Sequence, residues 1–287
     1  MSIQKRLPQS DRDMLVCDNI VKRVWDEQAN LKIEYTKSLD DSRRCAIYFS
    51  SNGIYFPNTE RTFLETIVKK DRYEWYRTRV KNASKHIFIR DVFKQWYIKG
   101  INSKICSQQE LLEFLKKETS GYEIITIGSS AGGYASAMFG TYLNASLSLA
   151  FSPQISLQKL ISESNDRCNP LLYKHASNGL VNIQGLISGN ENLFVFYGIN
   201  SQIDQEDISL VRNIGINQML FYEKRHGVPF KSFALPTIIN MEKDKLKELC
   251  TVVHHPNLFS LRYCNWNCLF RKIRTTIKSK LKCFLVI

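Results

Sequence analysis

The sequence predicts an α/β fold in which helices cover both faces of a mostly parallel sheet. Apolar runs typical of buried strands alternate with helical patterns through the middle of the chain. The 287 residues, 44% hydrophobic and 23% charged, have a globular composition and can bury a sizeable core. We expect one catalytic-type domain at residues 1–256, with a cap-like insertion near 154–190. A basic amphipathic tail at 257–287 would follow it.

The expected elements follow from local patterns. Ser107 is a plausible helix N-cap with Glu110 three residues later, and Gly121 closes that helix. Residues 59–82 fit a helix or a surface loop. The expected strands are 31–37, 45–58 (interrupted by Ser-Ser-Asn-Gly), 86–91, 122–128, 146–153, 192–198 and 217–224, and the further helices are 133–143, 204–215 and about 243–250.

The stretch IITIGSSAGGYAS at residues 124–136 contains the pattern G-x-S-x-G, with Ser130 at its centre. An apolar strand precedes the pattern and a small-residue helix follows it, as a nucleophile elbow requires. Gly128 and Gly132 would let the helix pack close to the strand. The competing interpretation is a tight turn of a nucleotide-binding fold, although G-x-G-x-x-G is absent. We predict that Ser130 is a nucleophile.

A serine hydroxyl needs a base, which in this type of fold comes late in the chain. His226 directly follows the strand 217–224, in the loop RHGVP, and is our preferred base. His254 and His255 lie later and are the alternatives. His86 and His175 are poorly placed.

The acid that orients the base should follow the preceding strand, 192–198. Asp204 comes first, in the loop before a helix, and is preferred. Asp207 is the alternative, but a carboxylate in the first turn of a helix is also favoured by the helix dipole. The acid would hold the imidazole in place and stabilise the imidazolium without taking the proton.

Two backbone N–H groups would form an oxyanion hole. Ala131, directly after the nucleophile, supplies one. The turn after an early strand should supply the other, from Ser51, Asn52 or Gly53, although an ordinary β-turn explains these residues as well.

Further along the chain, RDVFKQWYIKGI follows the next strand on the same edge of the sheet. Asp91, Trp96 and Tyr97 are therefore candidates for lining a substrate cleft. The two aromatic planes would suit sugar rings, but aromatic side chains at this spacing also occur in cores.

The net charge of +13 is unevenly distributed. Residues 257–287 hold seven Lys or Arg and no acidic residue: Arg262, Arg271, Lys272, Arg274, Lys278, Lys280 and Lys282. Such a tail suits the surface of an anionic membrane or an acidic polymer, and equally a solvated basic helix. No nucleic-acid-binding module is recognisable.

Compartment and metal content follow from what the sequence contains. The N-terminus has no apolar signal region, so we expect a cytoplasmic protein, with the tail allowing peripheral contact at the inner face of the plasma membrane. The eight cysteines include no CxxC pair, which favours free thiols. We expect no metal site.

The motifs FSSNG, RDVFKQWY, GSSAGGY, FSPQ and the HG loop resemble a divergent group of α/β-hydrolase proteins from bacterial capsule and surface-polysaccharide gene sets. That group includes the meningococcal serogroup A type of capsule O-acetyltransferase. The resemblance covers about residues 31–235. It implies a triad of Ser130, Asp204 and His226, and acetyl-CoA as co-substrate for acetylating sugar hydroxyls.

The expected function is therefore a serine O-acetyltransferase acting on a capsular or surface polysaccharide. A polysaccharide deacetylase or carboxylesterase with the same triad is the first alternative. A non-catalytic, hydrolase-like scaffold in an export assembly is the second.

Overall fold

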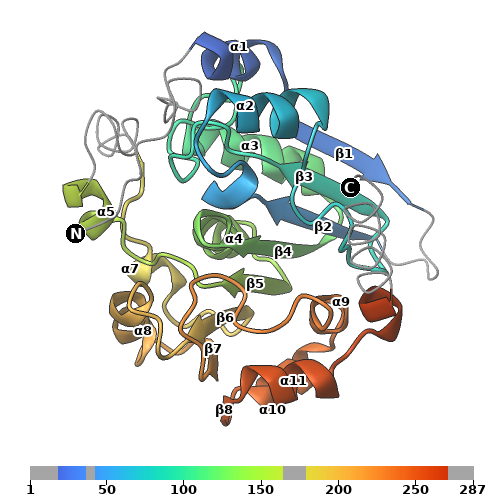
Figure 1. Cartoon of the computed structure of the whole chain (residues 1–287), viewed down its shortest axis with the longest axis vertical. Helices are drawn as coiled ribbons and strands as arrows, with labels where there is room; N and C mark the ends of the chain where they lie inside the picture. The colour runs from blue at the N-terminus through green and yellow to red at the C-terminus, as the bar shows by residue number, and fades with distance from the viewer. Residues whose placement is uncertain (1–18, 37–42, 164–178, 271–287) are drawn as a thin grey trace, which may run out of the picture.

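The computed structural model describes residues 19–36, 43–163 and 179–270, and these residues are built around an eight-stranded sheet (Figure 1). The strand order is β1-β3-β2-β4-β5-β6-β7-β8. Every neighbouring pair is parallel except β1 with β3, which is antiparallel. The strands are β1 Leu31–Tyr35, β2 Arg44–Phe49, β3 Lys85–Ile89, β4 Glu123–Ser129, β5 Leu147–Phe151, β6 Leu193–Gly198, β7 Asn217–Phe221 and β8 Val253–His254.

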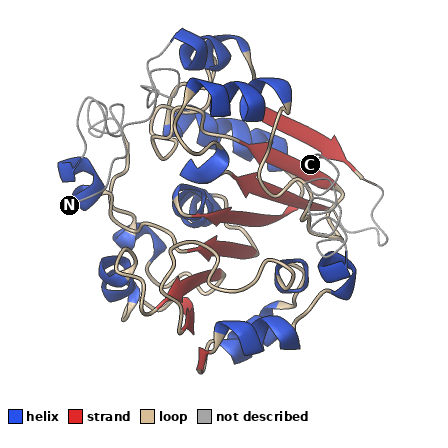
Figure 2. Cartoon of the chain, in the orientation of Figure 1, coloured by secondary structure: helices blue, strands red, loops and turns tan. Residues whose placement is uncertain are grey.

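Helices cover both faces of this sheet (Figure 2). Successive side chains of a strand point to opposite faces, so each strand contributes apolar side chains to two separate clusters. In β2, Ile47 and Phe49 face a cluster that contains α3 Gln108–Thr119 and α4 Ala131–Tyr142. Tyr48 faces the opposite cluster, built with α9 Leu235–Ile238, α10 Lys243–Leu249 and α11 Pro256–Arg262. Strands buried on both faces therefore appear in the sequence as nearly continuous apolar runs.

A mostly parallel sheet with a strand, a serine turn and a helix at its centre is the α/β-hydrolase arrangement. The predicted fold class is thus confirmed. Each predicted range contains a strand, but the one predicted at 45–58 ends at Phe49, and the chain beyond its turn forms a short 3-10 helix, η2 Asn52–Ile54, in place of a strand. The helix that begins after Ser107 is present, and the Ser107 hydroxyl accepts a hydrogen bond from the Glu110 N–H at 3.1 Å. Helix α8, Gln205–Val211, also lies where its pattern predicts it.

A smaller layer of helices lies near the β1 edge of the sheet. The sequence left open whether residues 59–82, which form part of it, would be a helix or a surface loop. Residues 59–82 form α2 Glu60–Phe63 and a π-helical segment, η3 Leu64–Lys69, followed by turns. With α1 Asn19–Glu27 they enclose a separate apolar cluster around Phe63 and Phe93.

The ends of the predicted insertion belong to the core. Ile155 and Ile183 are fully buried and are joined by a backbone hydrogen bond of 2.9 Å. The described part holds α5 Gln158–Glu163 and α7 Gln184–Ile187, and residues 164–178 lie outside the described residues.

The boundary predicted between residues 256 and 257 falls inside a packed helix. Helix α11 begins at Pro256, and Phe259 packs edge-on against Phe221 with ring centroids 4.9 Å apart. This helix is therefore part of the domain, while residues 271–287 lie outside the described residues. Within the described ranges, no helix has the length and hydrophobicity needed to span a bilayer.

Candidate active site

Ser130 stands at the turn between β4 and α4 with backbone angles of φ 56° and ψ −121°. A non-glycine residue rarely adopts this region, so the turn stores strain that the surrounding packing must hold. The flanking glycines explain how it is held. A Cβ on Gly128 would lie 1.9 Å from the Gly132 carbonyl oxygen, and one on Gly132 would lie 2.4 Å from the Phe49 carbonyl oxygen. The local geometry is that of a nucleophile elbow.

Three polar side chains form a continuous hydrogen-bonded chain at this turn. The Nε2 atom of His226 lies 2.8 Å from the Ser130 hydroxyl oxygen, and its Nδ1 atom lies 2.5 Å from Oδ1 of Asp204. An ionised carboxylate only accepts hydrogen bonds, so the proton belongs on Nδ1 and Nε2 is free to accept from the serine. The structure thus brings together the three residues that the sequence placed in order.

Asp204 is fully buried and precedes α8 in the N-cap position, but its side chain makes no capping bond. It faces His226 instead, and its second oxygen accepts from the Ser152 hydroxyl at 3.0 Å. Asp207, the alternative acid, is directed elsewhere. Its carboxylate accepts from the Ile155 N–H at 2.6 Å, and burial raises its pKa to about 7.

The base loop depends on a glycine beside the imidazole. Gly227 has φ +102°, a backbone conformation that residues with a Cβ rarely adopt, and its carbonyl oxygen lies 2.9 Å from the Ser152 hydroxyl oxygen. Of the alternative bases, His254 lies in β8, where its ring contacts the Leu249 carbonyl. His255 caps α11. Of these three candidate bases, His226 is the one that contacts Ser130.

The predicted oxyanion hole is changed by a carboxylate that sequence analysis did not consider. Glu74 accepts from the Ser51 N–H at 2.7 Å and from the Ser51 hydroxyl at 3.0 Å. The Gly53 N–H in turn donates to the Ser51 hydroxyl oxygen at 3.0 Å. Both amides are therefore occupied, which corrects their predicted role as free donors. Among the described residues, the N–H groups of Asn52 and Ala131, each the first residue of a helix, have no such acceptor.

Asp91, Trp96 and Tyr97 do not line an open cleft, and this corrects the prediction for them. They are 2%, 3% and 0% exposed, so none presents a ring or carboxylate face to a substrate. Tyr97 donates through its hydroxyl to the Ser50 carbonyl at 2.9 Å and so supports the loop after β2. These three residues are therefore part of the buried interior next to the site.

Gln154 is a residue of the site that sequence analysis missed. Its Nε2 atom lies 3.3 Å from the Ser130 hydroxyl oxygen and 3.1 Å from His226 Nε2. The signal was present in the sequence, because Gln154 follows β5, next to the strand that carries the nucleophile. The strand-end argument that predicts Asp204 and His226 therefore applies to this loop as well.

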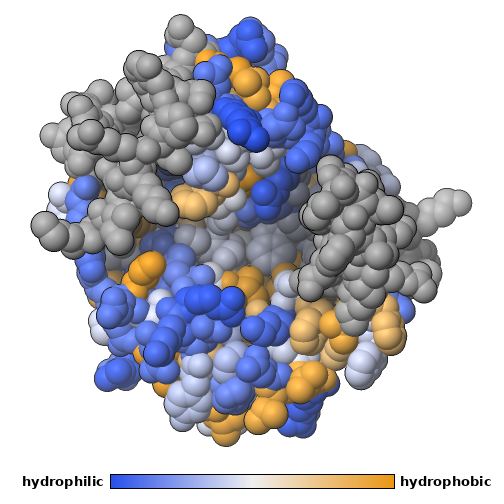
Figure 3. Space-filling model, in the orientation of Figure 1, coloured by the Kyte–Doolittle hydropathy of each residue, from blue (hydrophilic) through white to orange (hydrophobic). Residues whose placement is uncertain are grey.

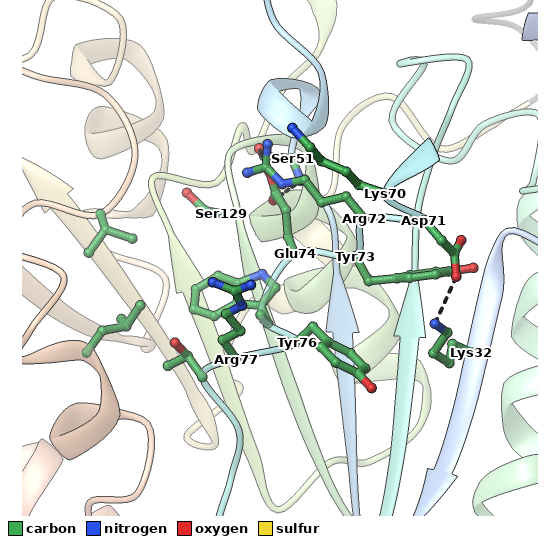
Figure 4. A pocket seen from close by; sticks show the side chains of 14 residues that line it. Lys32, Ser51, Lys70, Asp71, Arg72, Tyr73, Glu74, Tyr76, Arg77 and Ser129 are labelled. Atoms are coloured by element: carbon green, nitrogen blue, oxygen red, sulfur yellow. Dashed lines mark hydrogen bonds and ion pairs between the residues drawn. The ribbon is translucent and has the colours of Figure 1, made fainter. Parts of the chain in front are cut away.

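A cavity of about 970 Å³ opens beside the nucleophile turn (Figure 4). In that view Ser51 and Ser129 lie at one end and Lys32 with Asp71 at the other. The segment of residues 70–78 supplies most of its wall, including Tyr73, Trp75 and Tyr76.

The charge of this cavity is mainly positive. Lys32 is paired with Asp71 at 2.8 Å, and Arg72 donates to the Ile54 carbonyl at 3.1 Å. Lys70 and Arg77 make no ion pair with any described acidic residue. Burial raises the pKa of Glu74, which weakens the negative charge at the inner wall. The cavity suits an anionic ligand.

Over the same described ranges, no cluster of His, Cys, Asp and Glu side chains has the geometry to hold a metal ion. The chemistry that the site offers through its own side chains is nucleophilic attack by Ser130 with His226 as general base. The arrangement can take up an acyl group and pass it to water or to another hydroxyl.

No protein-family model and no curated protein matches the sequence. Among solved structures, the capsule O-acetyltransferase of Neisseria meningitidis serogroup A is 15% identical, with a TM-score of 0.48 over 68% of this chain and 83% of that one. A variant of that enzyme in complex with CoA is 14% identical, with a TM-score of 0.43 over 78% of this chain and 93% of that one.

The serine hydrolase FphF of Staphylococcus aureus, described as fluorophosphonate-binding, is 11% identical, with a TM-score of 0.43 over 77% of this chain and 92% of that one. At these identities and TM-scores, none of the three likenesses carries an inference about substrate or about the roles of residues.

Proposed function

We propose that this protein is a serine-dependent O-acetyltransferase that moves an acetyl group from acetyl-CoA to a hydroxyl of a capsular or surface polysaccharide. The observation that carries the acyl-transfer part is the contact chain from Ser130 through His226 to Asp204, at 2.8 and 2.5 Å, on a strained turn. The acetyl donor and the glycan acceptor rest on the motif resemblance and on the charge of the cavity.

In the first half-reaction, His226 Nε2 takes the proton of Ser130 as the hydroxyl oxygen attacks the thioester carbonyl. The Ala131 N–H, with the Asn52 N–H as second candidate, would stabilise the tetrahedral oxyanion. When the carbon–sulfur bond breaks, the imidazolium protonates the departing thiolate. Asp204 stabilises the imidazolium between these two transfers.

In the second half-reaction, His226 takes the proton of a sugar hydroxyl, whose oxygen attacks the acetyl-serine carbonyl. The bond to Ser130 then breaks and the serine recovers its proton from His226. Free serine and an acetylated sugar result, and no metal or redox step is required.

The cavity beside Ser51 supports an anionic donor or acceptor. The side chains of Lys70, Arg72 and Arg77 would face the phosphates of CoA or the charges of an acidic polymer. A donor of this kind is available in the cytoplasm, where the proposal places the protein.

The proposal is tested with radiolabelled acetyl-CoA and a panel of capsule polysaccharides. Label in the glycan fraction, lost in Ser130→Ala, is the expected result. Release of acetate with no labelled glycan would favour the esterase or deacetylase alternative, in which water takes the place of the sugar.

A fluorophosphonate probe distinguishes these enzymes from a non-catalytic scaffold. We expect the folded protein to be labelled at Ser130, because His226 is placed to activate that hydroxyl. Absence of labelling in correctly folded protein would leave only the scaffold.

A further inference from the structure

Gln154 has a carboxamide in contact with both the nucleophile and the base, and it is only 7% exposed. Its orientation is determined by Trp96. The indole Nε1 of Trp96 lies 3.1 Å from Gln154 Oε1, and an indole N–H can only donate. The oxygen of the amide must therefore face Trp96, and its NH2 group must face Ser130 and His226.

Two hydrogen bonds fix the backbone on either side of Gln154. Asp207 accepts from the N–H of Ile155, the next residue, at 2.6 Å. Tyr197 donates through its hydroxyl to the carbonyl of Pro153, the preceding residue, at 2.8 Å. With its neighbours on both sides anchored, the amide has little freedom to leave its place.

Gln154 approaches Ser130 from the side opposite to the loop of residues 51–53, here called the oxyanion loop. In the sheet, β4 lies between β2 and β5. The oxyanion loop follows β2, whereas Gln154 follows β5. Gln154 also contacts His226 Nε2. The leaving group and the second nucleophile both exchange their proton with that atom, so Gln154 lies on the side of Ser130 from which these groups reach the base.

A molecule that attacks the acyl-serine must lie within hydrogen-bond reach of the base and about 3–3.5 Å from the acyl carbon. The Gln154 nitrogen lies 3.1 Å from His226 Nε2, within hydrogen-bond reach of the base, and 3.3 Å from the Ser130 oxygen that would carry the acyl group. We propose that Gln154 keeps water from the acyl-enzyme and so directs the acyl group to a bound hydroxyl acceptor. This inference rests on the proposed acyl-transfer function.

Water and an acceptor differ in what they can offer for displacing the amide. Water could displace the amide only by making hydrogen bonds to Ser130 and His226, and the amide already makes equivalent hydrogen bonds to both. A sugar bound through its other groups can use that binding energy to turn the amide aside. Gln154 is therefore a positioning residue that sets the partition between hydrolysis and transfer.

The test uses p-nitrophenyl acetate with the full-length protein and no acceptor. The burst of nitrophenolate measures acylation, and the steady rate that follows measures hydrolysis of the acyl-enzyme. For Gln154→Ala we expect the burst to persist and the steady rate to rise about tenfold or more above wild type, equivalent to about 1.4 kcal/mol. Gln154→Met, which keeps the volume without the N–H donors, is the matched comparison and should hydrolyse at a rate between those of the wild type and Gln154→Ala, because it fills the space but no hydrogen bond holds it there.

A steady rate in Gln154→Ala equal to or below that of the wild type, with a normal burst and normal folding by circular dichroism, would overturn the inference. Absence of any burst and of fluorophosphonate labelling in the wild type would instead overturn the proposed function on which it rests. The two failures are therefore distinguishable.

A second, independent observation concerns the surface around α11. Leu258, Leu261, Trp266 and Phe270 are 56–68% exposed within one short stretch of chain, with the exposed Arg262 among them. Figure 3 shows hydrophobic side chains gathered at the lower edge of the molecule, in the region of α10 and α11. From residue 251 to the last residue the sequence contains no acidic side chain, and seven basic ones.

We infer that this surface, the apolar C-terminal face, docks on an anionic lipid surface. Leucine, tryptophan and phenylalanine side chains flanked by cations have the composition of interfacial segments, whose apolar groups enter the headgroup region while the cations bind acidic lipids. A protein partner with this complementarity would need an equally apolar acidic surface, whereas acidic lipid provides both features together.

The experiment is co-sedimentation of the full chain with vesicles of phosphatidylserine and phosphatidylcholine, compared with phosphatidylcholine alone. We expect binding only to the acidic vesicles, and loss of about tenfold or more in affinity for the double variant Leu258→Ser/Trp266→Ser. Phe56→Ser, which changes a 78% exposed side chain in another part of the fold, is the control and should bind normally.

Equal vesicle binding by the double variant and the wild type would overturn this assignment. So would self-association of the wild type that the double variant abolishes in the absence of any lipid binding, since the occupant would then be a second copy of the chain.

Discussion

Two loops at the carboxyl edge of the sheet each contain a buried aspartate, but the two carboxylates have different hydrogen-bond donors. Asp91, after β3, accepts from the N–H groups of Phe93, Gln95 and Tyr97 at 2.8–3.1 Å, all within its own loop. Asp204, after β6, accepts from His226 and Ser152, which belong to other segments.

The comparison shows how a buried carboxylate reveals its role. A carboxylate whose donors are backbone N–H groups of its own loop stabilises that loop, here one in which Lys94, Trp96 and Tyr97 all have positive φ. A carboxylate whose donor is the imidazole of a distant segment can act on the proton of that ring. The predictions below test this distinction, from the largest expected effect to the smallest.

Ser130→Ala should lower acyl turnover about 10⁶-fold, because the nucleophile is removed while binding is kept. The thermal midpoint should stay close to that of the wild type, and fluorophosphonate labelling should vanish. Retained labelling would place the reactive group elsewhere.

Asp204→Asn should lower turnover about 10⁴-fold, because the amide favours the wrong imidazole tautomer. Circular dichroism and the thermal midpoint report whether the fold is intact. A loss smaller than tenfold in folded protein would remove Asp204 from the catalytic group.

Asp91→Ala should lower the stability of the fold, and it should affect activity only through that loss. Several buried N–H groups lose their acceptor, and we expect a loss of about 3–5 kcal/mol in the free energy of unfolding, measured by denaturant titration. Unchanged stability with a collapse of turnover would reverse the comparison, because Asp91 would then act directly on the reaction.

Asp207 should make stability depend on pH. Its pKa in the folded protein is raised from 3.8 to about 7 by burial, so folding favours the protonated form. Its contribution is complete below about pH 4 and is lost as the pH rises to about 7. Relative to Asp207→Asn, the wild type should lose on the order of 1–3 kcal/mol across that interval, measured by urea unfolding at each pH. Parallel curves for the two proteins would show that Asp207 does not titrate there.

Trp96→Phe should have the smallest effect. It removes the one N–H that orients the Gln154 amide, at a cost of about 1 kcal/mol. The expected readout is a modest rise in acyl-enzyme hydrolysis, well below that of Gln154→Ala. A rise as large as that of Gln154→Ala would indicate that the indole itself excludes water.

Local sequence patterns predict the alternating strands, the strained turn at Ser130 and the order of Asp204 and His226. These features depend on local patterns and on the rule that the carboxyl ends of parallel strands meet at one edge. For the same reason the α/β-hydrolase class could be predicted before the strand order was known.

The availability of each polar group at that edge depends on how distant segments pack in the folded chain. Glu74 comes from a segment 23 residues away and occupies the Ser51 amide. Trp96 turns inward to a glutamine 58 residues further along the chain. Hydrogen-bond partners that are distant in sequence leave no periodic pattern, so whether a donor is free or already satisfied becomes visible only when the segments are packed together.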